Sequence, residues 1–110
     1  MTNELLKGTL KTIILKLLAE KGKMYGYEIT QEVKLMTEGK IQITEGALYP
    51  ALHALEAEGL LSTETMNIGK RVRKYYSLTK EGKNMVSVKL QEFVDFIVTM
   101  QSVLTLKPTL

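Results

Sequence analysis

The chain has 110 residues, 45% hydrophobic and 25% charged, which is ordinary for one globular domain with a hydrophobic core. No apolar run reaches the ~20 residues of a membrane span, and the N-terminus lacks the pattern of a secretory signal peptide, so we expect a cytoplasmic protein with no membrane partner. The absence of cysteine excludes disulfides, thiol catalysis and zinc fingers.

The formal net charge of +3 says less than the way the charge is distributed. No acidic residue occurs from Thr65 to Thr79, and four cations fall within five positions of that segment: Lys70, Arg71, Arg73 and Lys74. Such a cluster suits the phosphate backbone of a nucleic acid. A solvated hairpin turn would carry the same charges, and local charge alone leaves both interpretations open.

Two helices are predicted in the first part of the chain. The first has a helical spacing of apolar residues and ends at Gly22; its apolar residues are Leu6, Leu10, Ile13, Ile14, Leu17 and Leu18. The second runs from about Gly26 to Met36, with Ile29, Val33 and Met36 on its inner face.

A third helix is predicted after a short irregular segment. Lys40 to Ile43 alternates over too few residues for more than a short strand, and Thr44 is a typical N-cap. The inner stripe of the helix is Leu48, Ala51, Leu52 and Leu55, and Gly59 ends it. Because Pro50 removes a backbone donor, either the helix begins one turn late or its first turn is bent.

A hairpin and a long helix complete the chain. Leu60 to Met66 and Val72 to Leu78 are the strand candidates, joined by a glycine-containing turn. Thr79 is the expected cap of the last helix, which extends to about Leu106. The predicted fold class is α+β, mainly helical.

The sequence lacks the signals of an enzyme. His53 is the single histidine, no cysteine is available to complete a metal site, and no glycine-rich phosphate loop is present. Glu28 and Glu32 lie four residues apart, a spacing typical of a solvated helix surface. We therefore expect no catalytic residues, no metal and no cofactor.

Two helices joined by a short turn and followed by a basic hairpin match a winged helix-turn-helix. In that motif the second helix of the pair enters the DNA major groove with its N-terminal part, where Thr44, Tyr49 and His53 lie. Tyr25 precedes the other helix, whose free N–H groups can meet a phosphate. The competing interpretation is that Tyr49 packs against the hairpin and His53 is an ordinary surface residue.

The last helix carries an apolar seam at alternating spacings of four and three residues: Val86, Leu90, Phe93, Ile97, Met100 and Leu104. Such a seam packs helix against helix. Further apolar residues lie outside it: Val88, Val94, Phe96, Val98 and Val103. One small domain cannot cover so wide an apolar surface, which favours a homodimer over a helix folded back on its own core.

Four segments, read in order, strongly resemble the PadR family. They are Tyr25–Ile29 (YGYEI), Gly46–Leu52 (GALYPAL), Leu55–Leu61 (LEAEGLL) and Gly69–Thr79 (GKRVRKYYSLT). The resemblance covers about Leu5 to Leu104 and implies a dimeric winged-helix repressor. Some members release DNA on binding phenolic acids, antibiotics or other hydrophobic compounds. The total length resembles the smaller subfamily, which has a single C-terminal dimerisation helix.

The resemblance also implies an effector site, with one departure. Some members sandwich flat aromatic drugs with a tryptophan in the dimer pore, and this chain has none. Phe93, Phe96 and Met100 are the remaining candidates for an apolar effector site, and ordinary dimer packing is the competing role.

These observations predict a winged helix-turn-helix DNA-binding domain over residues 1–78 and a C-terminal dimerisation helix over residues 79–110, packed with the first helix as one compact unit. The expected function is sequence-specific transcription regulation, as a repressor released by a hydrophobic or aromatic effector. Its expected partners are a double-stranded DNA operator and a second copy of the chain. The alternatives are a winged-helix protein-interaction module and a small-molecule sensor without DNA binding.

Overall fold

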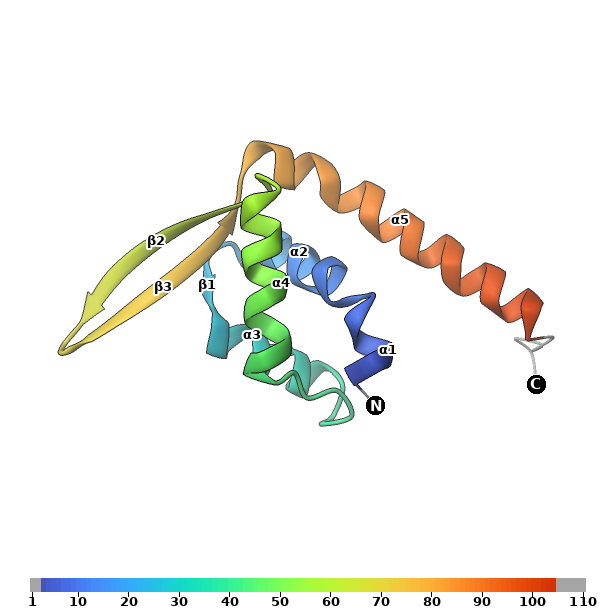
Figure 1. Ribbon diagram of the computed structural model, residues 1–110, viewed down its shortest axis with the longest axis horizontal. Coiled ribbons are helices and arrows are strands. Elements are labelled where there is room, and N and C mark those ends of the chain that lie inside the picture. The colour runs from blue at the N-terminus through green and yellow to red at the C-terminus, as the bar shows by residue number, and fades with distance from the viewer. Residues whose placement is uncertain (1–2, 105–110) are drawn as a thin grey trace.

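The computed structural model describes residues 3–104. Its elements, in chain order, are α1 (Asn3–Lys7), α2 (Leu10–Lys21), β1 (Met24–Tyr25), α3 (Gly26–Met36), α4 (Glu45–Ala57), β2 (Leu61–Ile68), β3 (Arg71–Leu78) and α5 (Lys80–Val103). The first four helices form a compact body, from which the β2–β3 hairpin and α5 project on opposite sides (Figure 1). This is the predicted mainly helical winged-helix fold with its long C-terminal helix.

The expected first helix is broken in two between Lys7 and Leu10. The Thr9 amide and hydroxyl both donate to the Leu6 carbonyl, at 2.9 and 3.1 Å, which closes a turn there. Gly8 favours this break because glycine costs about 1 kcal/mol in a helix interior. Leu6, Leu10 and Ile14 are nevertheless all buried, so the predicted apolar face continues across the break.

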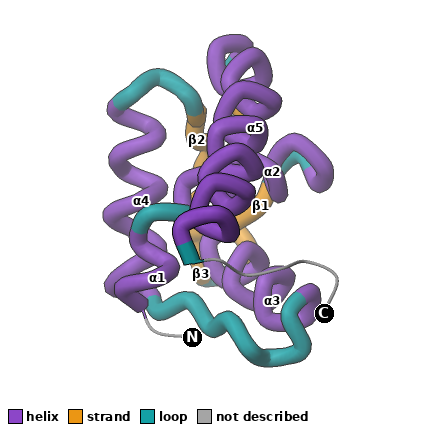
Figure 2. The backbone as a smooth tube through the Cα atoms, turned by 90° about the vertical axis from the view of Figure 1, so that its right-hand side faces the viewer, coloured by secondary structure: helices purple, strands orange, loops and turns teal. Residues whose placement is uncertain are grey.

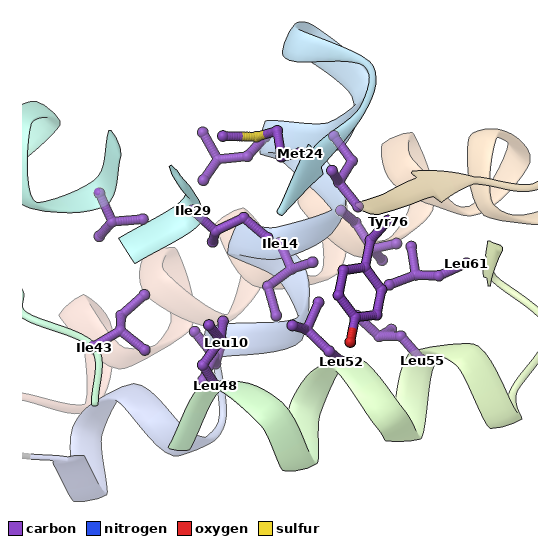
Figure 3. Packing of buried hydrophobic residues seen from close by; sticks show 14 of the residues in the cluster. Leu10, Ile14, Met24, Ile29, Ile43, Leu48, Leu52, Leu55, Leu61 and Tyr76 are labelled. Atoms are coloured by element: carbon purple, nitrogen blue, oxygen red, sulfur yellow. The ribbon is translucent and has the colours of Figure 1, made fainter. Parts of the chain in front are cut away.

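One hydrophobic core joins the helices to the sheet (Figure 3). Of the predicted stripe on α4, Leu48, Leu52 and Leu55 are buried and Ala51 packs against their cluster. Tyr76 of β3 is 1% exposed, and its hydroxyl points toward α4 (Figure 3). Residues from α2, α3 and β1 complete the cluster, among them Ile14, Leu17, Met24, Ile29 and Val33.

The connection between α3 and α4 differs from the prediction in two ways. Lys40 to Ile43 forms no strand, because the segment packs locally: the Ile41 amide donates to the Thr37 hydroxyl at 3.0 Å. Met36 was expected on the inner face of α3, but it is exposed because the helix ends there and the chain turns away.

The start of α4 resolves one of the open alternatives. Thr44 caps the helix as predicted, since its hydroxyl oxygen accepts from the Ala47 amide at 3.2 Å. The helix therefore begins at Glu45 and continues through Pro50, so a start one turn late is wrong.

The sheet has three antiparallel strands in the order β1-β3-β2. Thr63 lies opposite Tyr76 and Met66 opposite Arg73, and the two strands reach closer to the turn than predicted. β1 was not predicted, because two residues carry no periodic signal; it places Tyr25 opposite Tyr75.

The helix α5 begins at a close packing contact. The Thr79 amide donates to the Leu60 carbonyl at 3.0 Å, and the Thr79 hydroxyl oxygen accepts from the Gly82 amide, also at 3.0 Å. Seen along α5, the helix passes over α2, with which it is in contact (Figure 2). The predicted end near Leu106 lies outside the described residues. Within residues 3–104, no helix is long and apolar enough to cross a membrane.

Gly82→Ala should destabilise the fold, because a Cβ at this buried position would clash with the Leu60 carbonyl oxygen. We expect a loss of about 2–4 kcal/mol in the free energy of unfolding, measured by urea denaturation at fixed protein concentration. Gly46→Ala is the control: its Cβ meets only Thr44 Oγ1 at 4.0 Å, and removing a helical glycine should stabilise slightly. Equal stability of the Gly82 variant and the wild type would contradict this packing.

Candidate nucleic-acid interface

The helix pair α3 and α4 is held together at an aromatic contact. A Cβ built on Gly26, the first residue of α3, would lie 2.6 Å from the Tyr49 hydroxyl of α4. Tyr49 therefore packs against the start of α3, and it remains 36% exposed. His53 lies one turn further along α4, with ring centroids 6.4 Å apart, so the two side chains share the same exposed face.

Three elements line one open groove of about 350 Å³. They are the start of α3, the exposed face of α4 and the strand β3, which contribute Tyr25, Gly26, Tyr27, Tyr49, His53, Val72, Arg73, Lys74 and Tyr76. Five of the eight predicted DNA-binding residues thus come together here. Thr44, Lys70 and Arg71 do not line the groove: Thr44 caps α4 toward its other side, and Lys70 and Arg71 lie at the hairpin tip.

Arg73 is held over the ring of Tyr25, which in turn contacts the ring of Tyr75. Its guanidinium carbon lies 4.3 Å from the centroid of the Tyr25 ring, a cation–π distance. The Tyr25 and Tyr75 rings meet edge to face, with centroids 5.4 Å apart. Hydrogen bonding to the Tyr75 side chain raises the pKa of Arg73. A permanently charged group is therefore fixed where the β2–β3 hairpin, the wing of this fold, meets the start of α3.

Lys74 faces the other way, because successive residues of a strand point to opposite sides of the sheet. Its Nζ lies 3.8 Å from Glu56 Oε1 of α4 and 5.5 Å from the centroid of the Tyr76 ring. Burial, together with the nearby Tyr49 and Glu56, raises the pKa of Tyr76 and keeps its phenol neutral. The basic cluster is thus divided between the two faces of the hairpin.

The fold has counterparts among known proteins. Residues 14–88, more than half of the chain, match the transcriptional regulator PadR-like family. The chain belongs to this family of transcriptional regulators. A transcriptional regulator structure from Clostridium thermocellum has a TM-score of 0.76 and 30% identity, and the match covers 94% of this chain and 97% of that one.

Two further structures are similar to this PadR-like chain. A PadR family transcriptional regulator from Eggerthella lenta has a TM-score of 0.71 and 33% identity over 97% of this chain and 88% of its own. Bacillus subtilis PadR, solved in complex with operator DNA, has a TM-score of 0.67 and 35% identity over 74% of this chain. The match spans only 46% of that longer protein.

Sequence reasoning missed four residues of the groove: Gly26, Tyr27, Val72 and Tyr76. Tyr27 is 63% exposed in the first turn of α3, and Val72 is exposed on β3 beside Arg73. Tyr27 precedes the buried Ile29 by two residues and so lies off the inner face of the helix, a signal that the periodicity contained.

The predicted apolar seam of α5 is only partly buried within the chain. Val86 packs against the core, whereas Ile97 and Leu104 are exposed, as are the flanking residues Val88, Val94, Phe96, Val98 and Val103. Phe93 and Phe96 line a cavity of about 410 Å³ together with Leu5, Gly8, Thr9 and Thr12. Met100, the third effector candidate, does not line that cavity.

The described part of the chain contains no group of three histidine, aspartate or glutamate side chains placed to hold a metal ion. Glu28 has a structural role instead, since its carboxylate accepts from the Tyr25 amide at 3.0 Å and fixes the start of α3. Glu32 pairs with Lys21 at 3.5 Å.

Proposed function

We propose that this PadR-like chain is a sequence-specific DNA-binding regulator that acts as a homodimer in the cytoplasm and represses transcription until an effector binds. The observation that carries the proposal is the groove in which Tyr49 and His53 of α4 meet the arginine-bearing wing and the start of α3. The B. subtilis PadR complex supports it, because that relative was solved on operator DNA.

In the proposed interface, α4 contacts the bases, and the residues around it contact the DNA backbone. Tyr49 and His53 lie in the half of the helix that would face base edges in the major groove. The Thr44 oxygen is used as a cap, and its hydroxyl proton remains able to donate to a phosphate. The DNA backbone would meet Tyr25, Lys70, Arg71 and Arg73. Such contacts supply affinity with little sequence preference. Lys74 is directed toward Glu56 instead.

The proposed dimer is built on α5. The helix extends beyond the body of the chain (Figure 1), and many of its apolar residues are exposed. A monomeric protein rarely leaves so large an apolar surface uncovered. A second copy of the helix would cover the seam from Val86 to Leu104. Residues 1–78 then form the DNA-binding domain and residues 79–110 the dimerisation segment.

A hydrophobic or aromatic effector would fit beside this dimer helix. The cavity lined by Phe93 and Phe96 lies between α5 and the α1–α2 break, and most of its surface is apolar. Because α5 would also join the two subunits, a ligand there could change the spacing of the two wings. Met100 would contribute only if the partner helix brings it toward the ligand.

Arg71→Ala and Arg73→Ala should weaken binding to a selected operator and to random duplex alike. Removing a cation that neutralises one phosphate should lower the logarithmic salt slope by about one unit, because fewer counterions are released. Tyr49→Phe and His53→Ala should instead change the preference among operator variants, with a smaller effect on the slope. The measurement is fluorescence titration of both duplexes at several salt concentrations, with the operator selected from a random pool.

The matched control for the wing variants is Lys16→Ala. Lys16 is a cation on α2 that pairs with Glu20 at 2.6 Å, away from the groove. Its removal should leave the salt slope unchanged. Wing variants that keep the wild-type slope would show that the basic cluster is only a solvated turn, and a chain that selects no duplex would favour a role without DNA.

Ile97→Asp should convert the dimer into folded monomer. Ile97 is 42% exposed within its own chain, so the charge would harm the subunit interface more than the fold. Phe93→Asp should disrupt the dimer as well. Sedimentation at micromolar concentration measures the outcome.

Val88→Asp is the control for the dimer test. Val88 is similarly exposed, at 46%, but lies two residues from Val86 and so on the opposite side of the helix from the seam. The Val88→Asp variant should remain dimeric. If the Ile97 variant also remains dimeric, the seam is not the interface.

A further inference from the structure

Glu56 contacts both strands of the wing from the last turn of α4. Its Oε2 accepts from the Thr63 hydroxyl of β2 at 3.3 Å, and its Oε1 lies 3.8 Å from Lys74 Nζ of β3. Thr63 is directly opposite Tyr76 in the sheet, and the Tyr76 ring is buried against α4. One carboxylate therefore joins α4 to each strand of the hairpin.

This contact lies where the wing leaves the body of the protein. All residues from 64 to 72 are exposed, and Figure 1 shows the hairpin extending away from α4 beyond this point. On the opposite face of the sheet, Lys23 Nζ lies 2.6 Å from Glu64 Oε2. The base of the hairpin is thus tied on both faces at adjacent residues, while its tip has no such support. A small rotation at the base would move the tip, with Lys70 and Arg71, by a larger distance.

The Lys74 side chain is 44% exposed, and its contacts are made at this base. Its ammonium group lies near Glu56 and the Tyr76 ring, whereas Arg71 and Arg73 belong to the other face of β3. An ammonium paired with a carboxylate offers less net charge to a phosphate.

We propose that Glu56 is a positioning residue: its contacts with Thr63 and Lys74 fix the angle between the wing and α4, and Lys74 serves this contact instead of a DNA phosphate. The effect on DNA binding rests on the proposed function. Glu56, Thr63 and Lys74 together form what we term the wing clamp.

The direction in which Glu56→Gln changes the operator affinity distinguishes the wing clamp from a general effect of charge. Glu56→Gln removes a negative charge near the DNA surface, so charge alone predicts tighter binding to every duplex. The wing clamp predicts operator binding about threefold weaker, the change expected for one partly exposed ion pair. Binding to random duplex should not fall, so the ratio of operator to random affinity decreases.

Glu58→Gln is the matched control, with the same change of charge two residues away. Glu58 pairs with Lys11 of α2 at 2.6 Å, not with the wing. It should show only the electrostatic effect. Equal behaviour of the Gln variants at positions 56 and 58 would overturn the proposal.

The salt dependence tests the role of Lys74. Lys74→Met should weaken operator binding without changing the salt slope, in contrast to Arg71→Ala, and the charge-exchanged pair Glu56→Lys with Lys74→Glu should restore affinity. A slope reduced by about one unit in the Met variant would show instead that Lys74 contacts a phosphate. Circular dichroism checks that each variant is folded.

A measurement without DNA keeps the two proposals distinguishable. The chain has no cysteine, so spin labels can be placed on Asn67→Cys at the wing and Ala57→Cys at the end of α4. Their distance distribution is measured by pulsed electron resonance, with labelled chains diluted in unlabelled ones. Glu56→Gln should broaden the distribution, and Glu58→Gln should not. Broadening in a chain that binds no DNA would support the wing clamp and refute the proposed function. An unchanged distribution in a chain that binds operator would refute the wing clamp alone.

Discussion

Burial of the Tyr76 ring against α4 determines where the wing can lie. The ring enters the core beside Leu52 and Leu55 (Figure 3), and an aromatic side chain buried in this way removes roughly 150–250 Å² from water. Because strand residues alternate between faces, fixing Tyr76 on the core side also fixes its neighbours. Lys74 then lies on the side of the strand that contacts Glu56 of α4, and Arg73 and Tyr75 lie on the side that contacts Tyr25. The distribution of charge on the wing follows from one buried ring.

The same contacts that stabilise the fold assemble the groove. Tyr25 pairs with Tyr75 in the sheet and lies under the Arg73 guanidinium, while Tyr49 of α4 packs on Gly26. The start of α3 is consequently in contact with both the wing and the recognition helix. Glycine at position 26 permits this approach, since a Cβ there would displace the Tyr49 hydroxyl. The position of each side chain in the groove therefore depends on packing between elements distant in sequence.

The features that the sequence predicted correctly are those with local causes. Thr44 and Thr79 cap α4 and α5 because a hydroxyl two or three residues before free amides is recognisable in a short window. The errors arose where a local pattern competed with tertiary structure or was too short to decide. The prediction of one continuous first helix was wrong because Thr9 makes a turn with Leu6. Lys40 to Ile43 has a strand-like alternation, but no neighbouring strand is available to pair with it. The contact between Glu56 and Lys74 left no signal, because a distance between two elements is not encoded in either one. Five of the nine residues that line the groove could be named from the sequence, but not the division of the cations between two faces.

The central claim is that the start of α3, the part of α4 up to His53 and the wing form one DNA-binding surface. The most direct test is a titration of ¹⁵N-labelled chain with a duplex selected from a random pool, followed through its backbone amide resonances. The account predicts that shifts on binding concentrate in residues 25–28, 44–53 and 69–74, whereas residues 90–104 change little. Shifts confined to α5, or a saturated complex with 44–53 unperturbed, would contradict it.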